Sequence, residues 1–477
     1  MTFRPGQLHE NERLLTLVQG VPGRLVLWAA ATALLLWHGA GVVPLAAFAA
    51  VMLDPQRKRL WLSVAAFGAL GGRFFELPES PLSLLPAAPW LPAVLIAAAA
   101  TAALFLAWLL ARGFARWPAA FRRHPVLTVH AAIWAGLALS GLPWLGLLAL
   151  APYFAWRLSY LAVSAGRGRL AGTGFRDHLF YLVPAWGGTV TPYGKGLDYL
   201  SRHEAGDALA LARSRLAGVK LLLLAVAWVC ALGVMNIVVY GRAPELPGGQ
   251  TTRMAAEWLA GFALGWPSVS DVVRSGAHPP WYLGWAAIYL ELIRATLALA
   301  ATGHVIVGSL RLFGFNVFRN TYKPLLAESV LEFWNRYYYY FKELLVDFFF
   351  YPTYLRLRGL SPSLRMLAAV FAAAFLGNMY HHLLAQPEHI VRLDLPRLWT
   401  DWSPRLLYCF LLALGIWVSM LRQQRLRAAG SAAGAAVRLR RVAGVWTFYS
   451  LIHIWNLQGD GIDLAACAKF FLSLFGI

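Results

Sequence analysis

The 477-residue sequence contains few cysteines and few charged residues. Its three cysteines, Cys230, Cys409 and Cys467, lie far apart in apolar surroundings, so they offer neither a disulfide framework nor the paired spacing of a zinc site. Charged residues make up only 13% of the chain, whereas hydrophobic residues make up 59%. Together with a mean hydropathy of +0.57, this composition predicts an integral membrane protein.

The chain also lacks the repeated alternation of polar and apolar residues that a membrane β-barrel requires. Several of its apolar runs exceed the ~20 residues that a helix needs to cross a hydrocarbon core. The predicted fold class is therefore all-α, a polytopic helical membrane protein with roughly 9 to 12 membrane segments. The apolar runs begin near Leu25, Leu60, Leu84, Val126, Leu216, Trp281, Leu364, Leu406 and Val442.

Acidic residues are scarce, since 42 Lys and Arg face only 22 Asp and Glu, which gives a net charge of +20. The basic residues gather in short loops at 54–59, 111–124 and 421–441, whereas 76–80 and 459–463 are acidic. The positive-inside rule places the basic loops in the cytoplasm, and we expect residues 386–404 to be external. Nucleic-acid binding is disfavoured, because basic loops that face anionic lipid account for the charge.

Polar groups inside the apolar runs are candidates for function, because they are costly at membrane depth. Glu291 and Arg294 are three residues apart on a predicted helix, so we expect them to neutralise each other. The isolated His304 and His453 are typical of hydrogen-bonded core histidines. We therefore interpret these four residues as structural.

The densest polar stretch is residues 328–356, "ESVLEFWNRYYYYFKELLVDFFFYPTYLR". Read as a helix that Pro352 closes, it has a polar face, an aromatic face opposite, and a second polar row on an adjoining edge. This pattern fits either an interfacial helix or a helix that lines a polar cavity, and periodicity alone does not decide between them. The polar face holds Glu332, Arg336, Tyr340, Glu343 and Asp347; the aromatic face Trp334, Tyr337, Phe341 and Phe348; the second row Asn335, Tyr338 and Lys342.

A second polar stretch, "GNMYHHLLAQP" at 377–387, contains two adjacent histidines near the end of an apolar run. On a helix, Asn378 lies one turn before both His381 and His382, so its amide could meet an imidazole. A neutral imidazole with one nitrogen held and the other free is a suitable general base. The alternative is an interfacial pair at a helix end.

Three blocks in this order resemble the membrane-bound O-acyltransferase family, particularly the bacterial branch that acylates polysaccharides or transfers D-alanine to teichoic acid. The resemblance covers about residues 150–477. The first block is "YFAWRLSYLAVSAGRGRL" with the turn-rich "FRDHLFYLVPAWGGTVTPYGKGLDYL". The second is "FRNTYKPLLAESVLEFWNRYYYYFKELLVDFFFYP" and the third is "FAAAFLGNMYHHLL". The matching positions of the first block are Arg157, Ser159, Tyr160, Pro184, Gly188 and Pro192.

The resemblance implies one helical membrane domain around a central funnel or tunnel, with His381 as catalytic base after the aromatic Tyr380. It also implies an acyl thioester donor, either acyl coenzyme A or an acyl carrier protein, and an extracytoplasmic glycan or lipid-linked hydroxyl acceptor. The resemblance implies no permanently bound cofactor or metal. It implies accessory acyl-transfer or glycan-export proteins as possible partners. The implied catalytic residues are His381, Tyr338 and Asn335, and the implied substrate-binding residues are Asn378, His382, Arg336, Glu332, Lys342 and Trp334.

Two departures from the family pattern affect these roles. Tyr338 stands where a second histidine or an asparagine is usual, and His382 follows the main histidine where glycine is frequent. The nearby Asn335 offers the missing polar group. Transfer to a lipid or a secondary metabolite, a noncatalytic relative and a transporter remain as alternatives. We expect residues 1–149 to form N-terminal membrane helices and residues 150–477 the catalytic core, in a bacterial inner membrane.

Overall fold

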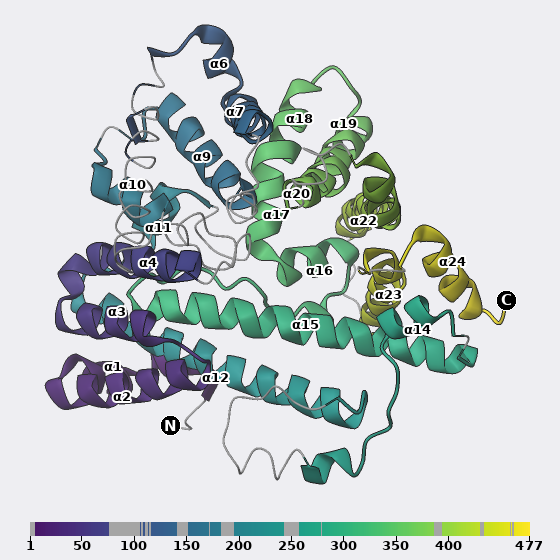
Figure 1. Cartoon of the computed structure of the whole chain (residues 1–477), viewed down its shortest axis with the longest axis horizontal. Helices are drawn as coiled ribbons and strands as arrows, with labels where there is room; N and C mark the ends of the chain where they lie inside the picture. The colour runs from purple at the N-terminus through teal and green to yellow at the C-terminus, as the bar shows by residue number, and fades with distance from the viewer. Residues whose placement is uncertain are drawn as a thin grey trace, which may run out of the picture. The chain divides into compact units, whose positions relative to one another are not determined.

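The computed structural model is built from helices (Figure 1). It describes residues 5–75, 116–140, 151–182 without 171, 195–242, 257–385 without 278, 394–429, 434–457 and 462–477, and a few isolated positions. Within these ranges there is no β-strand, and the only strand-like pairing is an isolated bridge between Glu204 and Phe315. The predicted all-α class is confirmed.

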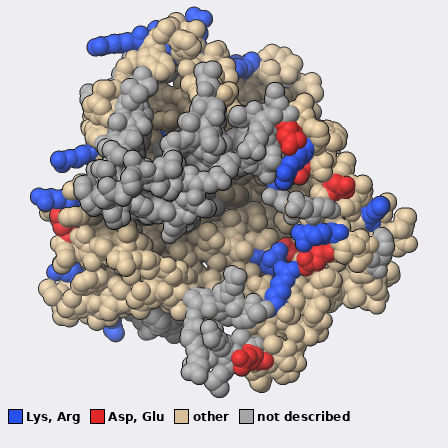
Figure 2. All heavy atoms as spheres, in the orientation of Figure 1, with Lys and Arg blue, Asp and Glu red and all other residues tan. Residues whose placement is uncertain are grey.

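The chain is an integral membrane protein by the length and composition of its helices. Four helical segments of the described residues are long and apolar enough to cross a membrane: Ala208–Val238, Trp281–Leu312, Pro362–Leu384 and Leu395–Arg425. A fifth is possible if the bent pair Glu12–Gln19 and Val21–Trp37 forms one span. Most of the described surface in Figure 2 is neither basic nor acidic, as a membrane protein requires.

The described residues account for only part of the roughly 9 to 12 segments that the sequence predicts. The run near Leu84 lies outside them. The runs near Leu60, Val126 and Val442 form the helices α4 (Lys58–Phe75), α7 (Pro125–Ser140) and α23 (Ala435–His453), which are not among the four long apolar segments.

The chain divides into two compact units. Unit 1 comprises residues 1–224 and 303–318, and unit 2 comprises residues 225–302 and 319–477. The helices α12 (Ala208–Val238) and α15 (Trp281–Leu312) contribute to both units. The predicted boundary between residues 149 and 150 lies outside the described residues, so that division stays a prediction.

In unit 1, α12 and α15 pack with their backbones in close approach. A Cβ atom added to Gly218 would lie 2.7 Å from the carbonyl oxygen of Gly308 and 2.9 Å from the amide nitrogen of Leu312. Small residues permit such crossings in membrane helices, where apolar side chains gain little by leaving lipid. The other principal helices of unit 1 are α1 (Glu12–Gln19), α2 (Val21–Trp37), α3 (Val42–Leu53), α4, α6 (Ala119–Arg123), α7, α9 (Ala151–Gly166), α10 (Phe175–Leu182) and α11 (Leu197–Arg202).

Unit 2 holds both polar stretches that the sequence singles out. Its part of α15 carries the predicted ion pair, with Arg294 Nε 3.1 Å from Glu291 Oε2, which confirms that these two residues neutralise each other. His304, on the unit 1 part of α15, is buried as predicted. The remaining elements of unit 2 are α14 (Val269–Ser275), α16 (Val330–Tyr337), α17 (Tyr339–Leu345), η8 (Val346–Phe350), α18 (Tyr351–Arg356), α19 (Pro362–Val370), η9 (Phe371–Gly377), α20 (Asn378–Ala385), α22 (Leu395–Ala429), α23, η10 (Ile454–Asn456) and α24 (Leu464–Ser473).

Two π-helical segments, η8 and η9, pack against each other directly before the histidine pair. A Cβ atom on Gly377 would lie 2.7 Å from Cδ2 of Phe349, so only glycine allows the ring to approach this closely. π-Helical turns occur often at functional sites, because the extra residue per turn changes the direction of the side chains that follow. Gly377 and Phe349 thereby fix how α20 presents His381 and His382.

Candidate active site

The second block is not one helix, as the sequence predicts, but two helices that meet at Tyr338. The backbone of Tyr338, with φ −138° and ψ 68°, leaves the helical region between α16 and α17. Figure 1 shows α16 and α17 as separate ribbons in different directions. Pro352 does not close the segment either, since it lies in the first turn of α18, where its missing N–H costs nothing.

A short segment distant in sequence, residues 320–322, satisfies the backbone groups that the break leaves free. Asn320 accepts hydrogen bonds from the first two amides of α17, that of Tyr339 at its backbone oxygen (3.0 Å) and that of Tyr340 at Oδ1 (3.3 Å). The amide of Tyr322 donates to the oxygen of Arg336 at 2.7 Å. Since unpaired helix ends are costly when buried, Asn320 and its neighbours stabilise the break.

The break overturns the predicted continuous polar face. Tyr340 is buried instead of lying beside Glu332 and Arg336. The latter two form an ion pair on α16, with Nη2 of Arg336 2.5 Å from Oε1 of Glu332. On α17, Lys342 pairs with Glu343.

Glu332 also helps to start α16, which gives it a structural explanation. Ser329 is the N-cap and accepts from the amide of Glu332 at 3.1 Å, while Oε2 of Glu332 accepts from the amide of Glu328 at 2.7 Å. This is close to a capping box, in which serine and a glutamate three residues later satisfy free amides at a helix start. The S-x-x-E part of the second block therefore has a local folding role.

Phe341 brings together three of the predicted site residues. Its ring centroid lies 4.7 Å from that of His381, 5.1 Å from that of Tyr338 and 6.4 Å from a ring of Trp334. Phe341 and Trp334 are buried, while Tyr338 and His381 are partly exposed. The helix break thus places Tyr338 and His381 on one aromatic cluster.

Asn335 does not join this cluster. Its side chain is exposed on α16, and among the described residues no hydrogen bond or ring contact links it to Tyr338 or His381. Asn378 is buried at the start of α20, but the described hydrogen bonds include none from its amide to His381 or His382. The possible contact between Asn378 and an imidazole is therefore not among the described hydrogen bonds, and a role of Asn378 in the site stays a prediction.

The neighbour that holds His382 is Arg405, a residue that the sequence analysis missed. Nη1 of Arg405 lies 3.4 Å from Nδ1 of His382. A guanidinium can only donate, so Nδ1 must accept and the proton of this neutral imidazole is on Nε2. Arg405 is 3% exposed within the Leu395–Arg425 span, and its Nε has no acceptor among the described residues. Its position at the start of an apolar run was the available signal.

His381 has a different environment, although it is the adjacent residue. Its Nδ1 is buried and has no hydrogen-bond partner among the described residues. Only Nε2 could then exchange a proton with a substrate, which requires the neutral tautomer with its proton on Nδ1. An enclosed, unsatisfied nitrogen costs about 1–3 kcal/mol. Nδ1 of His9 is in the same state, so His381 is distinguished by its ring contact with Phe341, which also contacts Tyr338.

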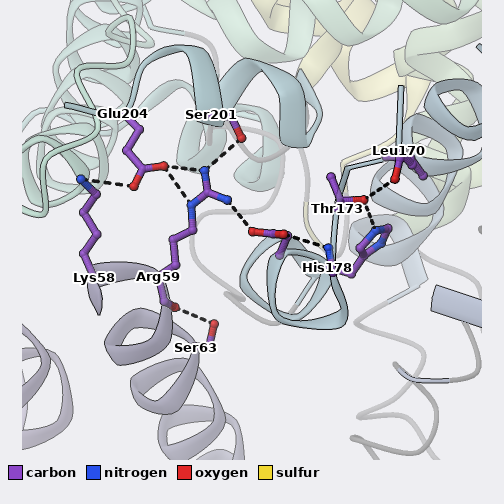
Figure 3. Close-up of polar contacts among 10 residues, drawn as sticks. Lys58, Arg59, Ser63, Leu170, Thr173, His178, Ser201 and Glu204 are labelled. Atoms are coloured by element: carbon purple, nitrogen blue, oxygen red, sulfur yellow. Dashed lines mark hydrogen bonds and ion pairs between the residues drawn. The ribbon is translucent and has the colours of Figure 1, made fainter. Parts of the chain in front are cut away.

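Unit 1 contains a second polar cluster, which Figure 3 shows around Arg59. Arg59 donates to Asp177 at 2.5 Å, to Glu204 at 2.5 and 2.9 Å and to Ser201 at 3.1 Å. Although burial opposes its charge, the hydrogen bonds and charges of Glu204 and Asp177 raise the pKa of Arg59. Every charge is matched, Lys58 pairing with Glu204 at 3.2 Å, so this cluster joins α4, α10 and α11 structurally.

The arginine of the first block, Arg157, also has a structural role. Arg157 is 2% exposed on α9, and its Nη1 donates to the backbone oxygens of Tyr181 (2.7 Å) and Leu182 (3.2 Å). These are free carbonyls at the end of α10, which an arginine can satisfy. Pro184, Gly188 and Pro192 lie outside the described residues.

Comparison of the chain with models of known protein families finds no family that matches, and comparison with curated proteins finds no relative. Within the described part of the chain, no group of three or more His, Cys, Asp or Glu side chains could hold a metal ion. The chemistry of the site has to be inferred from the cluster of Phe341, Tyr338, His381, His382 and Arg405.

Proposed function

We propose that the chain is a membrane-embedded O-acyltransferase that moves an acyl group, acetyl in the simplest case, from a thioester to a hydroxyl. The observation that carries the proposal is His381, a membrane-depth histidine with an enclosed Nδ1, set on the same aromatic cluster as Tyr338. The order of the three sequence blocks supports it. The donor would be acyl coenzyme A or an acyl carrier protein, and the acceptor a glycan or lipid-linked hydroxyl outside a bacterial inner membrane.

In the proposed reaction, Nε2 of His381 takes the proton of the acceptor hydroxyl as its oxygen attacks the thioester carbon. The carbon–sulfur bond breaks, the new ester forms, and the thiolate leaves and recovers the proton from the imidazolium. General base assistance contributes about 10²- to 10⁴-fold to the rate. The Tyr338 hydroxyl is the candidate donor to the developing oxyanion, because its ring shares the Phe341 contact with His381.

Arg405 and His382 support the site in this proposal without reacting. The guanidinium holds His382 in one tautomer, with its proton on Nε2, and so keeps the residue next to the base neutral and oriented. We place four residues outside the reaction, because their described contacts are ion pairs and backbone hydrogen bonds, or none, and do not include His381: Asn335, Arg336, Glu332 and Lys342.

One observation favours a noncatalytic relative instead. Tyr338 replaces the usual second histidine or asparagine of the family that the chain resembles, and the exposed Asn335 has no described contact that would compensate.

Membranes from cells that express the chain, incubated with radiolabelled acetyl coenzyme A, test the proposal. Label should appear in a glycan or lipid fraction and depend on the chain, and His381→Ala should reduce the transfer about 10²-fold or more. Equal labelling by the His381→Ala protein, with both proteins inserted at equal levels, would overturn the role of His381. No chain-dependent labelling with acetyl coenzyme A, longer acyl coenzyme A or a loaded carrier protein would favour the noncatalytic relative.

A further inference from the structure

A groove of about 710 Å³ lies in unit 2 between the start of α16, the last turns of α22 and the first half of α23. This volume is within the ~300–1,000 Å³ of sites that hold small molecules. The groove does not include His381, Tyr338 or Phe341, so it is separate from the candidate active site.

One end of the groove is strongly basic. Arg422 of α22 and Arg440 and Arg441 of α23 line it, facing Glu328 and Glu332 at the start of α16. Glu328 is already paired with Arg438 (2.7 Å) and Arg441 (3.5 Å), and Glu332 with Arg336 (2.5 Å). Among the described residues, Arg422 and Arg440 have no acidic partner. Figure 2 shows blue and red side chains together where α23 lies in Figure 1.

The remainder of the groove is mostly apolar, and one of its two walls belongs to the membrane-spanning segment Leu395–Arg425. Leu411, Leu414 and Val418 of α22 form one wall, and Val445 and Phe448 of α23 form the other. Leu414 is 37% and Val418 50% exposed, so this wall is not filled by the protein's own core. From Leu411 to Arg422 a helix rises about 16 Å, roughly half the hydrocarbon thickness.

Polar contacts hold the groove open at a fixed width. Nε2 of Gln423 donates to Oγ of Ser329 at 2.7 Å, and the amide of Leu331 donates to Oγ of Ser419 at 3.2 Å, which fasten α16 to α22. The hydroxyl of Tyr449 donates to the oxygen of Val330 at 2.9 Å, which fastens α16 to α23. On α23, a Cβ atom added to Gly444 meets nothing within 4 Å, so this glycine leaves space in the groove.

We propose that this groove binds an anionic phospholipid, with the phosphate between Arg422 and Arg440 and one acyl chain along the wall of Leu411, Leu414 and Val418. The occupant follows from charge and position. Arg422, at the water end of the spanning segment Leu395–Arg425, and Arg440, on α23, have no acidic partner among the described residues. The apolar wall of α22 continues from Arg422 into the hydrocarbon layer. Basic pockets between membrane helices are suited to such head groups. The proposal does not depend on acyl transfer by His381.

Native mass spectrometry of the purified full chain in detergent tests the proposal with dioleoyl phosphatidylglycerol and dioleoyl phosphatidylcholine as probes. We expect phosphatidylglycerol to bind more tightly, and Arg422→Gln and Arg440→Gln each to weaken it about fivefold, since one arginine near an anionic surface contributes about that much. Arg425→Gln, the same charge change on the exposed end of α22 outside the groove, is the matched control and should leave binding unchanged.

A second pair of variants tests the acyl chain site. Gly444→Phe should fill the groove and reduce binding of both lipids, whereas Ala443→Phe, which adds the same ring one position away on an exposed residue, should not. Equal binding of the two lipids together with no effect of the Arg422 and Arg440 variants would overturn the proposal. Displacement of phosphatidylglycerol by acetyl coenzyme A would also overturn the proposal, because the groove would then be the binding site of the acyl donor.

Discussion

Nη1 of Arg405 lies 3.4 Å from Nδ1 of His382, and the two residues belong to different membrane-spanning segments. This contact separates the adjacent histidines chemically, because His382 is committed to a guanidinium while His381 packs on Phe341. A buried arginine whose only described hydrogen-bond partner is an imidazole is a costly arrangement in a membrane. Such a cost is retained where the charge positions another group or meets an anionic substrate.

The first prediction concerns Arg405. Replacing it with leucine removes a buried charge, so Arg405→Leu should leave thermal stability unchanged or raised. Acyl transfer should fall only in part, because His381 is unchanged and only the fixed tautomer of its neighbour His382 is lost. In ¹⁵N spectra of histidine-labelled protein, His382 should be the Nε2–H tautomer in the wild type and a mixture in Arg405→Leu. An Nδ1–H signal for His382 in the wild type would contradict the contact.

The second prediction concerns the cluster around Arg59 in unit 1. Arg59→Lys should destabilise the protein by about 1–3 kcal/mol, because a single ammonium nitrogen replaces the three guanidinium nitrogens that donate to Asp177, Glu204 and Ser201. The expected destabilisation is smaller than the ~3–5 kcal/mol that removal of one partner of a fully buried ion pair costs, because Arg59 is 30% exposed. Arg57→Lys, at a 71% exposed position, is the control for thermal unfolding in detergent. Equal losses in both variants would show that the network contributes nothing specific.

The third prediction is a pH dependence at the start of α14. Hydrogen bonds from Ser268, with the charge of Arg242, lower the pKa of Asp271. A carboxyl with a lowered pKa stabilises the fold at pH values above its ordinary ~3.9, and this contribution is lost as the pH falls through the lower folded value. Asp271→Ala removes the carboxylate half of the capping box, and because Asp271 is 40% exposed the cost near neutral pH should be only about 0.2–1 kcal/mol. The cost should vanish in strongly acidic buffer; a cost independent of pH would refute this explanation.

The fourth prediction concerns the membrane topology. The charge pattern places residues 421–441 in the cytoplasm and residues 386–404 outside, and the arrangement of the helices does not test this. In a chain whose three native cysteines are replaced, a membrane-impermeant maleimide applied from outside should label Arg397→Cys and spare Gln424→Cys. Both positions are exposed, so access does not bias the result. Labelling of Gln424→Cys alone would invert the topology.

Sequence reasoning succeeded where the determining contacts are local. The all-α class follows from long apolar runs, and the pair of Glu291 and Arg294 follows from a spacing of three residues on one helix. The break at Tyr338 could not be predicted from helical periodicity, because the groups that stabilise it come from Asn320 and Thr321, 16 to 20 residues away. Hydrogen bonds between residues so far apart in sequence follow no regular spacing, so the sequence pattern does not reveal them.

The candidate site shows the same division. Neighbouring residues of a helix point about 100° apart, which predicts that His381 and His382 face different groups. In the structure His381 contacts Phe341 and His382 contacts Arg405. The identity of those groups, Phe341 and Arg405, depends on how α17 and α22 pack beside α20, which only the tertiary structure provides. Asn335 was assigned to the site on helical geometry that the break at Tyr338 removes.

The last prediction separates the two histidines. If Nε2 of His381 is the base, His381→Ala should lose acyl transfer by about 10²- to 10⁴-fold while the protein stays inserted and folded. His382→Ala should retain substantial transfer, because it removes the partner of Arg405 and not the reacting nitrogen. In the double variant His382→Ala with Arg405→Leu, part of the remaining defect should be suppressed, because the guanidinium left without an acceptor is removed as well. Initial rates from labelled acetyl coenzyme A, normalised to inserted protein, measure all four proteins. A dead His382→Ala beside an active His381→Ala would assign the base to His382, and full activity in both would make the pair structural.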